Sequence, residues 1–91
     1  MSVVTRVLLD VLKPHDPSVL DLACALGNLG DYRVRVRVLE MDKKTETLEI
    51  EVAGADVDFE AIQTVIRDLG AALHSVDEVD VSGVTLAPDA E

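Results

Sequence analysis

The sequence predicts a single α+β domain in which strands and helices follow one another in the order β-α-β-β-α-β. The chain has 91 residues, which is enough for one domain. Hydrophobic residues make up 48% of it, more than a disordered acidic chain contains, so we expect a folded body. The spacing of the apolar residues changes from strand-like to helix-like and back twice, which predicts the order of the elements.

The first two elements are a strand and a helix. Residues 3–12 are dense in β-branched and leucine side chains, which predicts a central strand covered on both faces. The prolines of Lys13–Pro17 end this strand because proline cannot donate to a β-ladder. We expect a helix to begin here, with Asp16 as its N-cap and Pro17 at its first position. The apolar stripe of this helix consists of Val19, Leu22, Ala23 and Leu26. The helix is expected to end at Gly27, Asn28 and Gly30.

The next two elements form a β-hairpin. Residues 32–41 alternate between arginine and valine, and a second alternating run follows the loop 42–45. The inward positions of both runs are even-numbered (Val34, Val36 and Val38; Leu48, Ile50 and Val52), which requires an odd-length loop or a bulge. This parity places Arg35 and Arg37 opposite Glu49 and Glu51.

The last two elements are a second helix and a fourth strand. Asp58 is the expected N-cap, and Val57 and Ile62 are expected to form a hydrophobic staple around it. Phe59, Ile62, Ile66 and Leu69 form the buried stripe, and Gly70 ends the helix. Residues 71–81 have strand-like composition. We expect one domain over residues 1–82 and an acidic, frayed tail over residues 83–91.

This order defines a ferredoxin-like βαββαβ sandwich with two helices on one face of a four-stranded antiparallel sheet. Right-handed crossovers place both helices on that face. The first and third strands are then central, and the fourth lies antiparallel beside the first.

Three segments resemble the signatures of the DUF211 family of small archaeal proteins: Leu9–His15, Asp56–Phe59 and Leu73–Val79. The resemblance runs from about residue 3 to residue 81. It implies a ferredoxin-like fold with a shape related to ACT regulatory domains, and ring-like homo-oligomers. It implies no established activity. The stripe of Arg33, Arg35 and Arg37 and the acid load look particular to this sequence.

Composition excludes several functional classes. Eighteen Asp and Glu against eight Lys and Arg give a net charge of −10, and the chain has one Phe, one Tyr and no Trp, which argues against a nucleic-acid binder. No apolar stretch is long enough for a membrane span and no secretion signal opens the chain, so we expect a cytoplasmic protein. The acid excess lies in residues 40–91, and it suits either general solubility or a halophilic, salt-rich cytoplasm. The single cysteine, Cys24, is expected to be a buried thiol.

Two histidines mark the first candidate site. Because the fourth strand runs antiparallel to the first, its start should bring His74 close to Lys13 and His15, with Asp77 and Glu78 nearby. The expected pairing sets Leu8, Asp10 and Leu12 opposite Glu78, Val76 and His74. Such a group suits a transition metal, an anion held by Lys13, or a pH-sensitive contact. Alternatively, His15 is an exposed loop residue and His74 a strand residue with one satisfied nitrogen.

Three acidic residues mark the second candidate site. Asp56, Asp58 and Glu60 offer oxygen ligands at alternate positions, which resembles part of a calcium loop. Three carboxylates fall short of a full calcium shell unless a neighbouring subunit completes it. Helix capping by Asp58, with Glu60 favoured by the helix dipole, is the alternative explanation.

The sheet face without helices is expected to be an oligomer interface. The first strand is apolar at both its odd-numbered and its even-numbered positions, so Leu8 and Leu12 would be exposed to solvent in a monomer. Leu39 and Met41, out of step with the valine face of their strand, could join this patch.

Together these features favour a non-catalytic, homo-oligomeric binding or regulatory module. Its ligand would be a metal ion, such as calcium or a transition metal, or a small metabolite at a subunit boundary. No catalytic residue is assigned. The alternatives are a small enzyme with an inter-subunit site around His15 and His74, and a purely structural assembly protein.

Overall fold

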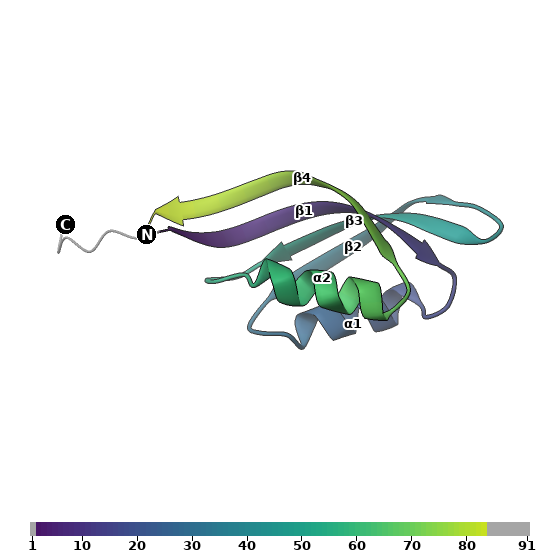
Figure 1. The fold of residues 1–91 in the computed structure, drawn as a ribbon, viewed down its shortest axis with the longest axis horizontal. Coiled ribbons are helices and arrows are strands. Elements are labelled where there is room, and N and C mark those ends of the chain that lie inside the picture. Colours follow the sequence, from purple (N-terminus) through teal and green to yellow (C-terminus); the bar gives the residue numbers. More distant parts are fainter. Residues whose placement is uncertain (1, 84–91) are drawn as a thin grey trace.

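The computed structural model describes residues 2–83 and contains four strands and two helices in the predicted order (Figure 1). The elements are β1 (Ser2–Pro14), α1 (Val19–Gly27), β2 (Arg33–Met41), β3 (Thr45–Ala53), α2 (Phe59–Asp68) and β4 (Ala72–Gly83). The α+β ferredoxin-like fold is therefore confirmed. Gly83, predicted as the first tail residue, ends β4, and the rest of the predicted tail lies outside the described residues.

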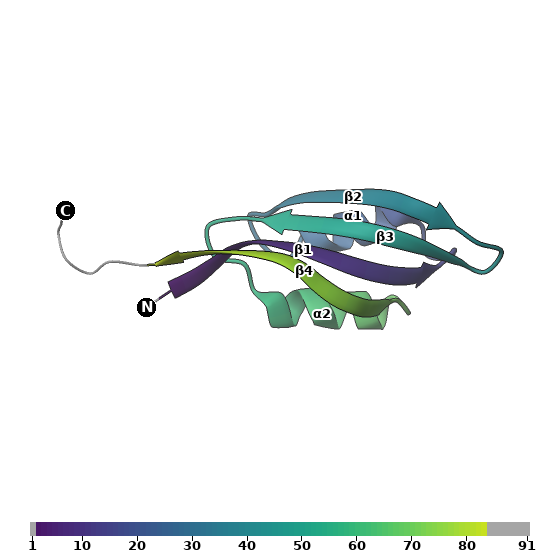
Figure 2. The ribbon, with the colours of Figure 1, turned by 90° about the horizontal axis from the view of Figure 1, so that it is seen from above.

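The four strands form one antiparallel sheet in the order β2-β3-β1-β4. The first and third strands are central and β4 lies beside β1, as predicted. Both helices cover the same side of the sheet, as the two views in Figures 1 and 2 show. We call this side the helix face and the other side the open face. Strands β2 and β4 are the two edges.

The hydrophobic core lies between the sheet and the helices. Alternate residues of β1 and β3 point into it, and each helix contributes two fully buried side chains. The core residues from these elements are Val7, Leu9, Val11, Leu48, Ile50, Val52, Leu22, Leu26, Ile62 and Ile66.

The β2–β3 hairpin has the predicted register. Arg35 lies opposite Glu51 and Arg37 opposite Glu49. The register shifts by one residue between Val38 and Glu40, so Leu39 is a bulge. Of the two possibilities that the even-numbered inward positions allow, a bulge or an odd-length loop, the hairpin contains the bulge.

The β1–β4 ladder departs from the predicted register. Leu8 lies opposite Glu78 as expected, but Asp10 pairs with Ser75 and Leu12 with Ala72. The pairings expected with Val76 and His74 are therefore wrong. The cause is irregularity within β4: the ladder skips Asp77 and then His74, each of which adds an unpaired residue to the edge strand.

The start of α1 differs from the prediction. Ser18, not Asp16, is the N-cap: its backbone is extended and its hydroxyl accepts the amide hydrogen of Asp21 at 3.0 Å. Cys24 is exposed rather than buried, because it lies about 200° around the helix from Leu22 and so points away from the core.

The second helix begins as predicted. Asp58 caps α2 by accepting the amide hydrogen of Ala61 at 3.1 Å, and the staple residues Val57 and Ile62 are both buried. Neither helix in residues 2–83 is long and apolar enough to cross a membrane.

Candidate functional site

A buried ion pair lies at the hairpin end of the sheet, on the helix face. Lys13 of β1 and Glu46 of β3 are opposite each other in the ladder, and Lys13 Nζ lies 2.9 Å from Glu46 Oε1. The Lys13 side chain is fully buried and that of Glu46 is 9% exposed. Neither charge is well hydrated, so each depends on its protein partners.

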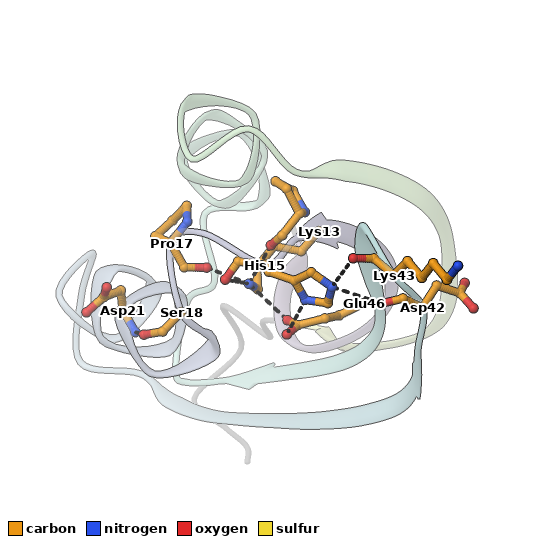
Figure 3. Close-up of polar contacts among 9 residues, drawn as sticks. Lys13, His15, Pro17, Ser18, Asp21, Asp42, Lys43 and Glu46 are labelled. Carbon is orange, nitrogen blue, oxygen red and sulfur yellow. Dashed lines mark hydrogen bonds and ion pairs between the residues drawn. The ribbon is translucent and has the colours of Figure 1, made fainter.

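The loop between β1 and α1 wraps around the Lys13 ammonium. Lys13 Nζ donates to the carbonyl of Pro14 at 2.7 Å and to that of Pro17, and lies 3.5 Å from the carbonyl of His15 (Figure 3). With its carbonyl held by Lys13, Pro17 belongs to the loop, and the helix begins beyond it at the Ser18 cap.

His15 joins this ion pair to the tip of the β2–β3 hairpin. Its Nδ1 lies 3.2 Å from Glu46 Oε2, while its Nε2 lies 2.8 Å from the carbonyl oxygen of Asp42 and 3.1 Å from that of Lys43 (Figure 3). Its side chain is 39% exposed. We call Lys13, His15 and Glu46 the Lys13 cluster.

These contacts lower the pKa of Glu46 and raise the pKa of His15. The hydrogen bond from Lys13 is the largest cause that lowers the pKa of Glu46, and it outweighs burial, which acts the other way; His15 adds to the lowering. The hydrogen bond to Glu46 is the largest cause that raises the pKa of His15, followed by the carbonyl of Asp42. Charged forms are therefore favoured at both positions.

The other predicted members of the first site lie elsewhere. His74 and Asp77 sit at the two irregular positions of β4, on the opposite side of β1 from β3. Asp77 accepts a hydrogen bond from the Ser75 hydroxyl at 2.6 Å, and Glu78 pairs with Arg6 at 2.8 Å. The structure thus brings Lys13 and His15 together with Glu46, but it does not connect them to His74, Asp77 or Glu78.

The second predicted site is organised by a tyrosine. The Tyr32 hydroxyl accepts the amide hydrogen of Asp58 at 2.8 Å and lies 3.4 Å from the carbonyl of Asp56. Asp58 caps α2, and Glu60 lies in the first turn. Within the described part of the chain, no group of three or more His, Cys, Asp or Glu side chains is placed to hold a metal ion.

A charged row crosses the open face. Arg6 of β1 bridges outward in both directions, to Glu51 of β3 on one side and to Glu78 of β4 on the other. Asp80 Oδ2 lies 3.8 Å from the same guanidinium. Towards the β2 edge, Arg37 pairs with Glu49 at 3.3 Å, and Arg35 lies opposite Glu51. We call this set the open-face row.

The four predicted interface residues do not form one patch. Leu8 and Leu12 are half-buried on the open face, and Leu8 lies between Glu51 and Glu78. Leu39 and Met41 are 53% and 61% exposed near the end of β2, where Met41 lies opposite Glu46 and therefore on the helix face.

Sequence reasoning missed Glu46, Arg6 and Tyr32. For Glu46 the signal was present: Lys13 continues the odd-numbered core stripe of β1, and Glu46 continues the even-numbered stripe of β3. Extending both stripes by one step predicts a buried, opposite pair of unlike charge. Arg6 and Tyr32 carry no such signal, because Arg6 pairs with Glu51 and Glu78, which are not directly opposite it in the ladders, and Tyr32 contacts the backbone of the loop before α2.

Comparison with known proteins places this chain among uncharacterised relatives. The DUF211 family, described as an uncharacterised ArCR family, matches residues 5–90. The chain is also similar to an uncharacterised protein, MJ0319, of Methanocaldococcus jannaschii, with 41% identity over 80 residues that span 87% of this chain and 82% of the relative.

Proposed function

The chain belongs to the DUF211 family, and we propose that it is a non-catalytic, homo-oligomeric binding module whose copies join edge to edge through β2 and β4. The partner at each edge is a second copy of the same chain. The charges of the open face support this contact.

Charge alternates from strand to strand across the sheet. At the level of Arg6 the row reads, in spatial order, Arg35 of β2, Glu51 of β3, Arg6 of β1 and Glu78 of β4. Asp10 of β1, opposite Glu49, is an exception to this alternation. The two outermost strands therefore carry opposite charges. If β4 of one copy lies beside β2 of the next, the alternation continues across the junction. This continuity is the observation that carries the proposal.

The same charges disfavour the symmetric alternatives. A twofold contact of β2 with β2 would set exposed Arg33, Arg35 and Arg37 against their own copies, and a contact of β4 with β4 would do the same with Glu78 and Asp80. Like charges directly opposite each other destabilise a sheet, whereas opposite-charge pairs contribute about 0.2–1 kcal/mol each. Charge therefore favours a head-to-tail contact.

The helix face of the two edges supports the same arrangement. Val76, Val79 and Val81 of β4 are 42%, 50% and 55% exposed. On β2, Val38 is 44% and Met41 61% exposed. Edge-to-edge pairing would bring these two apolar groups together and also satisfy the free backbone groups of both edge strands.

Head-to-tail contacts form a closed ring when the rotations between successive copies add up to a full turn, and otherwise they continue as a filament. We favour a ring, and a ligand at the junction. His74 and Asp77 support this location, because both are exposed on β4, out of register with β1. A metal ion or small metabolite bound there would also contact the neighbouring copy.

An enzyme built on both His15 and His74 has less support, because the contacts of His15 go to β3 and the hairpin.

Light scattering coupled to size-exclusion chromatography tests the proposal. The wild type should have a mass of at least twice the 9.8 kDa of a single chain. The double variants Arg33→Glu/Arg35→Glu and Glu78→Lys/Asp80→Lys should each reduce this mass, because each gives both edges the same charge. The exposed residue Asp68 on α2 supplies the control, and Asp68→Lys should keep the wild-type mass. A wild type that is monomeric in both physiological and molar salt would contradict the proposal.

A further inference from the structure

We propose that His15 is a proton-dependent latch, whose doubly protonated ring ties the tip of the β2–β3 hairpin to the loop between β1 and α1 and releases the tip when one proton is lost. The latch does not depend on oligomerisation, because all its contacts lie within one chain.

The geometry around the ring requires two donors. Nδ1 faces the carboxylate of Glu46, and Nε2 faces the backbone carbonyls of Asp42 and Lys43. All three partners are acceptors. A neutral imidazole carries one N–H and can satisfy only one side, leaving a lone pair against an acceptor on the other. Only the imidazolium donates in both directions. When it loses one proton, the remaining proton stays on Nδ1, because the ionised Glu46 carboxylate is a stronger acceptor than the tip carbonyls, which therefore lose their donor.

The charged groups around the ring come from three segments. Glu46 of β3 is ionised by its pairing with Lys13, and it attracts the imidazolium. Lys13 of β1 opposes protonation of the ring, but its ammonium is enclosed by loop carbonyls as well as by Glu46. The side chains of Asp42 and Lys43 extend away from the ring, so the hairpin tip meets it through carbonyl oxygens (Figure 3). Asp16, next to His15 in the loop, is exposed.

The hairpin tip has little else to hold it. Residues 42–44 are exposed, and Asp42 is joined to Thr45 by one backbone hydrogen bond of 2.8 Å. Loss of the Nε2 contacts would therefore leave the tip free to move relative to the β1–α1 loop.

The direction of the pH effect follows from the contacts. The folded pKa of His15 is raised above its ordinary value of 6.5. The latch is therefore complete below pH 6.5, and it is lost as the pH rises through the raised value. Acidification far enough to protonate Glu46 removes the ion pair between Glu46 and His15 Nδ1, so this half of the latch is also lost at low pH.

Nuclear magnetic resonance of ¹⁵N-labelled protein tests the latch. Near pH 6 the two ring nitrogens of His15 should both show the shifts of protonated imidazolium, and the titration midpoint should lie above 6.5. Across that midpoint, exchange of the Asp42 amide, which donates to the Thr45 carbonyl, should accelerate beyond the rise of the intrinsic rate. A single neutral tautomer throughout, or a midpoint at or below 6.5, would overturn the proposal.

Two variants separate the latch from a general pH effect. His15→Gln cannot donate in both directions, so its Asp42 amide should already exchange fast near pH 6 and show no step. The matched control is His74→Gln, because His74 lies on β4, away from the hairpin, and this variant should keep the step. Tip exchange in folded His15→Gln that matches the wild type at every pH would refute the latch. Should His15→Gln unfold, the ring shifts of the wild type decide the question.

Discussion

Lys13 and Glu46 are the two residues whose environment most constrains the rest of the site. Each is buried with a charge, and the cost of desolvating a charge is repaid only when the partner and the remaining hydrogen bonds are in place. Lys13 meets this condition through a carboxylate and the carbonyls of its own loop, so a single ammonium positions His15 beside the hairpin.

The substitution Glu46→Gln should destabilise the fold by about 3 kcal/mol, because it leaves the buried Lys13 charge without its carboxylate. Urea denaturation followed by circular dichroism measures the change. The matched control is Glu49→Gln, which removes the partner of exposed Arg37 and should cost less than about 1 kcal/mol. Equal effects for the two variants would mean that burial does not set the strength of the Lys13 pair.

The same pair predicts how stability responds to acid. The folded pKa of Glu46 is lowered, so its contribution is fully present above the ordinary value of 4.5 and is lost as the pH falls through the folded value. The stability difference between wild type and Glu46→Gln should therefore shrink as urea titrations are repeated from pH 7 towards pH 3. A difference that stays constant over this range would show that the ionised carboxylate is not the stabilising group.

At the scale of elements, the sequence predicts all six with nearly correct boundaries, because the periodicity of each apolar stripe reflects its position against one core. It does not predict the irregular positions in β4. Asp77 and His74 lie on an edge strand with mostly exposed side chains, where no buried stripe enforces strict alternation. The misplacement of His74 beside His15 follows from those two skipped residues.

The end of α2 shows a local signal that the sequence does carry. Gly70 has a φ of +80°, and the amides of Gly70 and Ala71 bond the carbonyls of Arg67 and Ile66 in a Schellman pattern. Glycine is the residue that adopts this conformation without steric cost.

Gly70→Ala should therefore lower the free energy of unfolding by about 1–2 kcal/mol, because a Cβ is disfavoured at positive φ. Gly27→Ala at the end of α1 is the control: its φ is not positive and the added Cβ would meet Val34 Cγ2 at an ordinary 4.0 Å. We expect Gly27→Ala to be neutral or slightly stabilising. Thermal denaturation distinguishes the two, and a loss of stability of the same size in both would contradict the role of the positive φ.

At the scale of the whole molecule, the net charge of −10 is less informative than its arrangement. The sequence predicts the arginine stripe of β2 and its partners on β3. It does not predict that Arg6 links β3 to β4: the predicted strand order sets β1 between them, but Glu51 and Glu78 are not the residues directly opposite Arg6 in either ladder. Only the assembled sheet reveals that charge alternates from edge to edge and leaves opposite signs on β2 and β4.

The most direct test of edge-to-edge assembly is a charge swap within one chain. The quadruple variant Arg33→Glu/Arg35→Glu/Glu78→Lys/Asp80→Lys exchanges the charges of the two edges, so the edges of neighbouring copies are again complementary. Its mass by light scattering, with folding verified by circular dichroism, should return to that of the wild-type oligomer, whereas each double variant alone should have a lower mass. A folded quadruple variant that remains monomeric, or double variants that keep the wild-type mass, would contradict assembly through these edges.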